Sequence, residues 1–376
     1  MKLNIFSSGC ALFAMLFGAG NIILPLILGR SLGDATALAM IGFILTAVLI
    51  PLIGFVAVMH ARGDHRQFLG QLGKYPALII AGLCMGLLGP FGAAPRCIAI
   101  AYADLAWYIP GLDMKFFSII LAFIIWFLSY KQNRVMTILG GYLGPLKITC
   151  LFALLAIGLL SPGPGELIHE PLKSDIFWQG LISGFGTMDL LAIIFFSKLV
   201  YENLAAKNIA GQYTKVCLVA GILLALVYSG FATMTAIHSA RVTGIADDTM
   251  LSALTSILLG TKAGIFANIS IGLTCLITAI ALCSTFADFL SRDILKNKIS
   301  YKSALGITVT LCALMANLRF SGIMNLVLPF LSLCYPALMF FAMLYIASEL
   351  GWIKINKARI GFFIAFVITC IHAVFN

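Results

Sequence analysis

The sequence FGAGNIILP, residues 17–25, lies inside an apolar run long enough to cross a lipid bilayer. Two glycines and a proline are unusual there, because each glycine weakens a helix by roughly 1 kcal/mol and proline by about 3 kcal/mol. A broken helix also frees backbone N–H and C=O groups that lipid cannot satisfy. Helix packing alone could explain the glycines, but it requires neither Asn21 nor Pro25. The stretch therefore predicts an unwound binding segment in the middle of a transmembrane helix, as in many secondary transporters.

The composition places the whole chain in a membrane. Of its 376 residues, 61% are hydrophobic and only 10% are charged, whereas soluble domains carry about 25% charged residues. The net charge of +10 does not indicate a nucleic-acid partner, because no run of basic residues could follow a phosphate backbone. The first apolar run is longer than the core of a cleaved signal peptide. We therefore expect a multi-pass membrane protein that is embedded in the lipid bilayer.

Apolar segments of about 20 residues predict eleven transmembrane helices. They lie near residues 5–29, 36–60, 77–109, 116–130, 139–161, 176–200, 214–238, 263–290, 303–317, 321–348 and 358–375. A twelfth is possible if Pro329 and Pro336 split the tenth. Most of the 24 Lys and Arg residues fall on the side that holds the N-terminus, which predicts a cytoplasmic N-terminus and outer loops at 161–175 and 238–260.

The sixth span contains a second polar, glycine-interrupted stretch, SGFGTMD at residues 183–189. At 1.5 Å per residue, both breaks reach mid-depth from opposite sides of the membrane. Two matched breaks, five spans apart and opposite in direction, predict an inverted repeat of five plus five helices. We expect one transmembrane domain over residues 1–376, with repeats at 1–161 and 176–348 and an accessory helix at 358–375.

The breaks suggest a division of roles. The amides near Gly20 and Asn21 begin the second half of the first span, where a helix dipole favours a carboxylate. The carbonyls that end its first half are then free for a cation. The substrate-binding residues that we predict are Gly18, Ala19, Gly20, Asn21, Gly184, Gly186, Thr187 and Asp189.

Three ionisable residues lie deep within the spans, namely Arg96, Lys147 and Asp189. Such residues cost several kcal/mol unless they are paired or hydrated, so each is a functional candidate. The alternative is a structural ion pair that joins Asp189 to Arg96 or Lys147. A protonated Lys147 could also occupy a sodium-sized site, which would make the proton the coupling ion.

Hydroxyl groups line one face of the eighth span, where Thr274 and Thr278 are four residues apart. Together with Gly18 and Asn21 they form a candidate cation site, in which threonine oxygens would face the carbonyls of the first span. The alternative is that each hydroxyl bonds back to its own helix. An intramembrane hydrolase is disfavoured, because only one aspartate lies deep in a span and no HExxH metal motif occurs. An ion channel is disfavoured because no selectivity-filter loop is seen.

These motifs together resemble the bacterial branched-chain amino acid carriers, the LIVCS family of the amino acid/polyamine/organocation superfamily. The resemblance rests on GAGNII with Pro25, on the GP and APR residues around Arg96, on PLKI around Lys147, on TMD at residues 187–189 and on CLITA from Cys275. It covers nearly the whole chain in the same order.

The resemblance implies an all-α, leucine-transporter-type fold with broken first and sixth spans, in the bacterial inner (plasma) membrane. It implies a transporter rather than an enzyme, with no cofactor. Its substrates would be leucine, isoleucine and valine, imported by alternating access with a cation, usually Na⁺. The carbonyls of the sixth span and the Thr187 hydroxyl would take the substrate ammonium. The alternative is a proton-coupled carrier of another small neutral amino acid on the same fold, which Lys147 supports.

Overall fold

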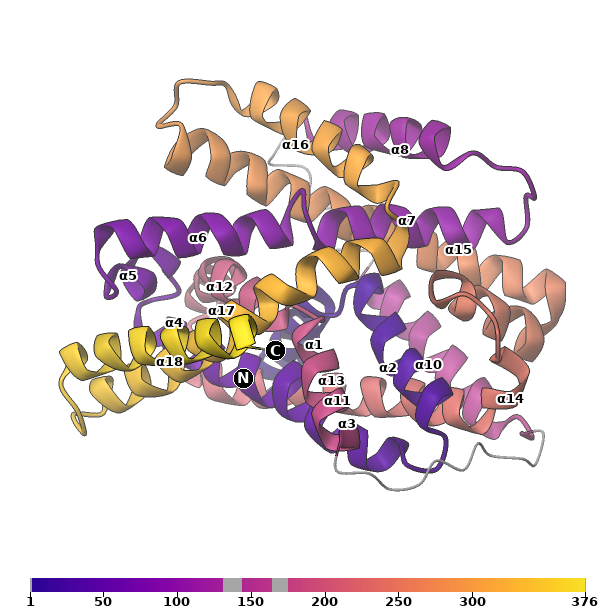
Figure 1. Ribbon diagram of the computed structural model, residues 1–376, viewed down its shortest axis with the longest axis horizontal. Helices are drawn as coiled ribbons and strands as arrows, with labels where there is room; N and C mark the ends of the chain where they lie inside the picture. The colour runs from indigo at the N-terminus through magenta and orange to yellow at the C-terminus, as the bar shows by residue number, and fades with distance from the viewer. Residues whose placement is uncertain (1, 131–143, 164–174, 376) are drawn as a thin grey trace.

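A computed structural model describes residues 2–130, 144–163 and 175–375, which form helices joined by short turns (Figure 1). The loop predicted at 161–175 lies mostly outside the described residues. The first half of the chain contains α1 (Lys2–Leu16), α2 (Ala19–Leu32), α3 (Thr36–Ile44), α4 (Ile50–His60), α5 (His65–Gly70), α6 (Lys74–Leu88), α7 (Ala93–Ala106), α8 (Met114–Ser129) and α10 (Gly144–Leu160). The second half contains α11 (Asp175–Phe185), α12 (Asp189–Ala206), α13 (Tyr213–Ile237), α14 (Ser239–Val242), α15 (Met250–Phe289), α16 (Tyr301–Ala316), α17 (Arg319–Glu349) and α18 (Ile355–Phe375).

Over the described residues, each predicted span coincides with one helix or with consecutive helices of the structure. The first span consists of α1 and α2, which are bent by 76° relative to each other. The tenth span is the single helix α17, which continues through both Pro329 and Pro336, so the prolines do not produce a twelfth span. A π-helical turn, Leu45–Leu49, joins α3 to α4 within the second span, and another, Leu290–Ile294, follows α15.

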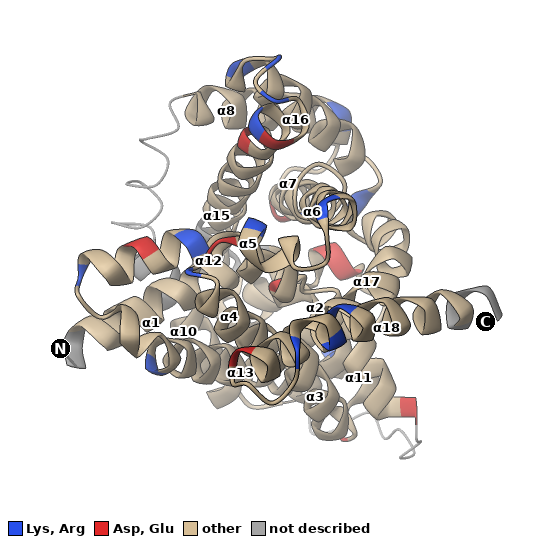
Figure 2. Ribbon diagram, turned by 90° about the vertical axis from the view of Figure 1, so that its left-hand side faces the viewer, with Lys and Arg blue, Asp and Glu red and all other residues tan. Residues whose placement is uncertain are grey.

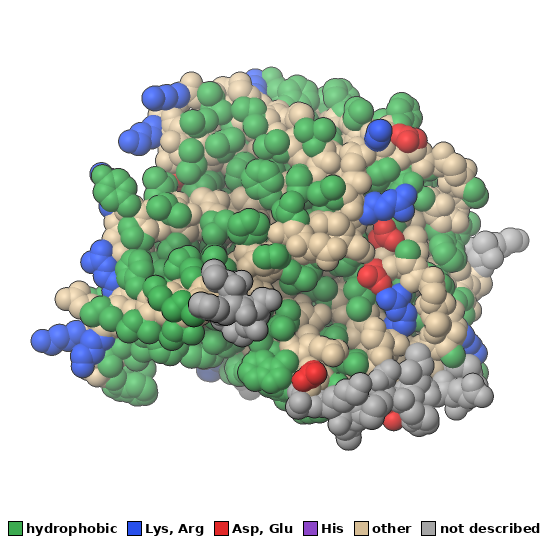
Figure 3. All heavy atoms as spheres, in the orientation of Figure 1, with side chains coloured by type: hydrophobic (Ala, Val, Ile, Leu, Met, Phe, Trp, Pro, Cys, Tyr) green, Lys and Arg blue, Asp and Glu red, His purple; other side chains and the backbone are tan. Residues whose placement is uncertain are grey.

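The surface of the molecule is that of a membrane protein. Large apolar side chains are exposed along α8, including Phe116, Ile119 and Phe123, and along α18, including Ile360 and Ile364. Their three- or four-residue spacing places them on one stripe of each helix, where lipid would cover them. Hydrophobic side chains cover much of the face in Figure 3, and in Figure 2 the charged residues lie mainly at helix ends and in turns.

Two parts of the chain differ from the sequence-based expectation. The third span was predicted as one helix over 77–109, but it is interrupted between Leu88 and Ala93, where Gly92 adopts φ −139° and ψ −87°. The segment 238–260 was predicted as a polar loop, yet it contains α14, the short 3-10 helix η4 (Asp247–Thr249) and the start of α15. Gly260 separates that start from the spanning part of α15 with φ 74°, a conformation that glycine adopts at little cost.

The core holds the broken first span in place. Helix α2 packs against α13, α3 packs against α11, and α7 packs against α15. Beside the first break the rings of Phe13 and Phe17 stack with centroids 5.3 Å apart, and Tyr228 packs against Phe17 at 5.5 Å and against Phe43 at 5.3 Å. This aromatic cluster surrounds the point at which α1 ends and α2 begins.

Candidate functional site

The break in the first span lies at Phe17 and Gly18, as the sequence predicted. Gly18 has an extended backbone, with φ −82° and ψ 154°, and its carbonyl accepts the N–H of Asn21 at 3.0 Å. The amide of Gly20 belongs to the first turn of α2, where a helix N–H has no acceptor within its own helix. Helix α2 then runs through Pro25 to Leu32, so the interruption is confined to the glycine-rich part of the motif.

The break in the sixth span, also as predicted, covers residues 186–188, between the end of α11 and the start of α12. Met188 has φ 60°, in the left-handed region that non-glycine residues seldom adopt. The Thr187 hydroxyl donates to the Gly184 carbonyl at 2.9 Å and accepts the Asp189 N–H at 3.4 Å. Side-chain bonds thus replace part of the helical hydrogen bonding that the turn removes.

Asp189 joins the two breaks. Its side chain is 1% exposed, and its two carboxylate oxygens accept separate hydrogen bonds at 2.8 Å, one from the Asn21 amide and one from the Tyr228 hydroxyl. The Asn21 amide also lies 3.3 Å from the Leu16 carbonyl at the end of α1. The asparagine of the first motif and the aspartate of the second therefore meet, although 168 residues separate them in the sequence.

Arg96 approaches the same place from α7. Its side chain is 1% exposed, and its guanidinium donates to the Gly186 carbonyl at 2.6 Å and lies 3.2 Å from the Met324 sulfur. Among the described residues, Arg96 and Asp189 are not within ion-pair distance of each other. The structural ion pair that the sequence allowed between these two residues is therefore not formed in this conformation.

A cavity of about 780 Å³ begins at the two breaks. Its inner end is lined by predicted site residues, namely Gly18, Gly20, Asn21, Arg96, Thr187, Asp189, Thr274 and Thr278. From there it follows α1, α12 and α15 to Ser7, Asn203 and Asp288, which lie near the ends of these helices. Ser7 and Asn203 are exposed, so the cavity opens to the surface at that end of the molecule.

The candidate cation residues line this cavity. The Thr278 hydroxyl donates to the Thr274 carbonyl at 2.9 Å, which is the back-bonded geometry given above as the alternative to ion binding. A Cβ atom added at Gly18 would lie 3.5 Å from the Thr278 methyl group, so the break in the first span lies against α15.

The remaining predicted residues have different surroundings. Gly184 packs against the end of α3 and the π-helical turn after it, since an added Cβ would lie 2.9 Å from the Phe43 carbonyl oxygen and 2.0 Å from the Thr46 hydroxyl. The Gly186 carbonyl accepts the bond from Arg96. Ala19 begins α2 and Lys147 lies in α10, but their side chains are outside what the structure describes. The predicted role of Lys147 therefore stays a prediction.

Sequence reasoning missed two tyrosines. Tyr228 of α13 donates to Asp189, and Tyr335 of α17 donates to the Thr46 carbonyl at 3.0 Å and accepts the Leu190 N–H at 3.3 Å. Both side chains are fully buried. The only signal in the sequence is a hydroxyl within an apolar span, which many structural tyrosines also show.

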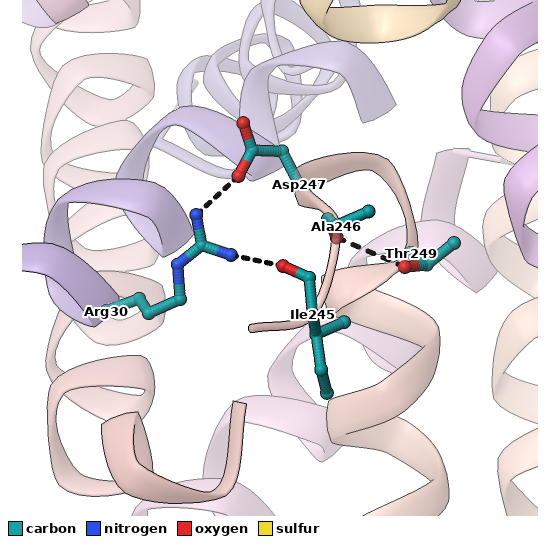
Figure 4. A network of polar contacts seen from close by, with 5 residues as sticks. All are labelled: Arg30, Ile245, Ala246, Asp247 and Thr249. Carbon is teal, nitrogen blue, oxygen red and sulfur yellow. Dashed lines mark hydrogen bonds and ion pairs between the residues drawn. The ribbon is translucent and has the colours of Figure 1, made fainter. Parts of the chain in front are cut away.

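At the opposite end from the cavity mouth, α2, the second half of the first span, is attached to the segment before α15 (Figure 4). Arg30, in the last turn of α2, pairs with Asp247 at 2.5 Å and donates to the Ile245 carbonyl at 2.6 Å. Farther along, Ser252 donates to the buried Asp104 of α7. These contacts hold residues 245–252 over the ends of α2 and α7.

We expect the Arg30–Asp247 pair to stabilise this closed end. Replacing Arg30 by Asp places like charges together, whereas the double variant Arg30→Asp, Asp247→Arg restores opposite charges. Because both side chains are partly exposed, a coupling of about 1 kcal/mol is expected. Each single reversal should lower the apparent melting temperature in detergent, and the double variant should recover part of the loss. Equal melting temperatures in all four proteins would contradict a stabilising role for the pair.

Comparison with known proteins identifies the family. A family model described as "Branched-chain amino acid transport protein" matches residues 1–376. The branched-chain amino acid transport system 3 carrier protein of Pseudomonas aeruginosa is 28% identical over 346 residues, which covers 89% of this chain and 78% of that protein. The branched-chain amino acid permease BraB of Bacillus subtilis is 27% identical over 341 residues, which covers 87% of this chain and 76% of the permease.

A solved structure supports the fold. Mhp1, a nucleobase-cation-symport-1 family transporter in a closed conformation, superposes with a TM-score of 0.64 at 15% identity, over 98% of this chain and 91% of the other. The all-helical, leucine-transporter-type architecture expected from the sequence is therefore confirmed. The family match shows a transporter rather than an enzyme. With its full-length match and its two broken helices, this chain belongs to the family of branched-chain amino acid transport proteins.

Proposed function

We propose that the protein imports leucine, isoleucine and valine by symport with Na⁺, using alternating access. The observation that carries this proposal is the cavity that starts at the two broken helices and opens at one end of the molecule. A site at the junction of two discontinuous helices, reachable from one side, is what a secondary transporter needs in one of its two states. The proposed repeats, 1–161 and 176–348, place one such helix in each half.

The inner end of the cavity has groups suited to an amino acid. The Gly20 amide at the start of α2 would take the carboxylate. Asp189 and the carbonyls beside it would take the ammonium, with the Thr187 hydroxyl close by. Apolar residues near the same level would surround the aliphatic side chain, among them Ala93 and Ile277. Because one methylene is worth about 1–3 kcal/mol in such a pocket, discrimination among the three substrates should be modest.

The position of the cavity mouth supports an inward-facing state. Its mouth lies at the N-terminal end of α1 and the C-terminal ends of α12 and α15. The positive-inside pattern of the sequence assigns that side to the cytoplasm. We therefore place the N-terminus in the cytoplasm, the protein in the bacterial plasma membrane, and the Arg30–Asp247 contact at the outer surface.

The proposed Na⁺ site lies between α1 and α15. The last carbonyls of α1 point along the helix axis toward the break and form the negative end of its dipole. Thr274 and Thr278 line the cavity there, and hydroxyl and carbonyl oxygens are ligands that hard cations prefer. Thr278 would have to rotate about χ1 to coordinate an ion, because its hydroxyl is bonded to the Thr274 carbonyl. Threonine has two accessible rotamers in a helix, so this rotation is inexpensive.

Uptake of radiolabelled leucine into proteoliposomes tests the function and its coupling together. We expect an imposed Na⁺ gradient to drive accumulation, a pH gradient of equal size not to drive it, and Thr278→Val to abolish the Na⁺ dependence. Uptake driven by the pH gradient alone and lost in Lys147→Met would instead identify a proton-coupled carrier. Absence of leucine uptake under either gradient, with protein correctly inserted, would overturn the substrate assignment.

A further inference from the structure

Arg96 occupies a position that helix stability does not explain. It lies in the first turn of α7, directly after the interruption of the third span, and its own N–H donates to the Gly92 carbonyl at 3.1 Å. A cation near a helix N-terminus is unfavourable, because the helix dipole is positive there. The guanidinium is nevertheless fully buried at the centre of the protein.

The partners of Arg96 within the described part of the chain do not neutralise its charge. The guanidinium has five N–H donors; its hydrogen bonds there go to the Gly186 carbonyl and the Met324 sulfur, both uncharged groups. Its Nε atom is buried without any hydrogen-bond partner among the described residues. A buried charge in this state costs several kcal/mol unless another group compensates it.

The orphaned donor lies against Gly20, one of the residues predicted to hold the carboxylate. A Cβ atom built on Gly20 would lie 3.7 Å from the Arg96 Nε and 3.8 Å from its Cζ, so the guanidinium packs against the first turn of α2. Arg96, Gly20 and Asp189 all line the same cavity. One buried cation and one buried anion thus face a shared space without forming an ion pair with each other.

We propose that Arg96 is a specificity residue that binds the carboxylate of the transported amino acid, together with the Gly20 amide, while Asp189 faces the ammonium. This inference rests on the proposed function and deepens it. It makes the site complementary to a zwitterion, so that a pocket with apolar walls would reject aliphatic amines and fatty acids that share the side chain of the substrate. The Gly186 carbonyl holds the guanidinium in place and links its position to the break in the sixth span.

The test compares leucine with leucinol, in which a CH₂OH group replaces the carboxylate and the ammonium is kept. Calorimetric titration of the purified full-length protein gives both dissociation constants for wild type and for Arg96→Gln. Wild type should bind leucine at least about 10-fold more tightly than leucinol. In Arg96→Gln the Kd for leucine should rise about 10- to 100-fold, as for a lost charge-assisted contact, with the Kd for leucinol unchanged.

Two further variants separate this role from a structural one. Arg96→Lys keeps the charge and should retain part of the preference for leucine, which also provides a readout if Arg96→Gln does not fold. Arg292→Gln makes the same change near the cavity mouth, where Arg292 pairs with Asp288 at 2.8 Å, and should leave both constants unchanged. Equal weakening of leucine and leucinol in the Arg96 variants, or no change in either, would overturn the proposal. Wild-type protein that binds no leucine would overturn the proposed function itself.

Discussion

Asp189→Asn should reduce leucine uptake at least about 30-fold in reconstituted protein that still folds. The substitution keeps the size of the side chain. The new amide oxygen can accept the Asn21 N–H, and the Tyr228 hydroxyl, which donates to the carboxylate at 2.8 Å, can turn to accept from the new NH2 group. The substitution removes the negative charge of Asp189, which faces the predicted ammonium position. Truncating one partner of a buried charge pair costs about 2–5 kcal/mol, and each 1.4 kcal/mol is tenfold in affinity. Initial rates of uptake at subsaturating leucine measure the loss.

Asp288→Asn is the matched control for this experiment. Asp288 lines the same cavity near its mouth and pairs with Arg292 at the surface, so the same loss of charge there should change uptake less than about twofold, as for exposed ion pairs. Both variants should elute as single peaks from size-exclusion chromatography. If Asp189→Asn transports leucine at the wild-type rate, the carboxylate does not recognise the substrate ammonium.

The two breaks could be predicted from the sequence because their signals are local. Glycines and an asparagine within an apolar span indicate an interrupted helix whatever packs around it, and the structure interrupts the first span at Gly18 and the sixth at residues 186–188. Span limits followed from apolar length alone. The pairing of Asn21 with Asp189 was not predicted, because it depends on how two distant spans cross.

Other features could not be read from local signals. The interruption between Leu88 and Ala93 was missed, although Gly89, Pro90 and Gly92 lie in it. Apolar residues continue on both sides of this segment, so the sequence favoured one continuous helix in spite of the glycines. The partner of Arg96 is a backbone carbonyl, and every residue type carries one. A sequence can therefore show that a buried charge needs a partner without showing which group supplies it.

The second large effect concerns the close approach of α3 and α11. A Cβ atom at Gly180 would lie 1.9 Å from the Ala39 carbonyl oxygen and 2.7 Å from its carbon. These are backbone atoms, so the clash cannot be relieved by a rotamer change and the two helices must separate. Overpacking of this kind costs about 1–3 kcal/mol or more. Gly180→Ala should therefore lower the apparent melting temperature in detergent and the yield of monodisperse protein.

Gly82→Ala provides a control of opposite sign. Gly82 lies within α6, and an added Cβ would meet no atom within 4 Å. Alanine is favoured over glycine by about 1 kcal/mol inside a helix and restricts the unfolded chain, so this variant should melt at the same temperature as wild type or higher. The same chemical change should thus stabilise α6 but separate α3 from α11, because of the two glycines only Gly180 lies at a backbone contact.

The Gly180 substitution should also affect the site, since α11 ends at the second break. A displaced α11 should move Thr187 and Asp189. Gly180→Ala protein that remains folded should therefore bind leucine more weakly than wild type, whereas Gly82→Ala protein should not. Equal melting temperatures for the two variants would contradict a tight backbone contact between α3 and α11.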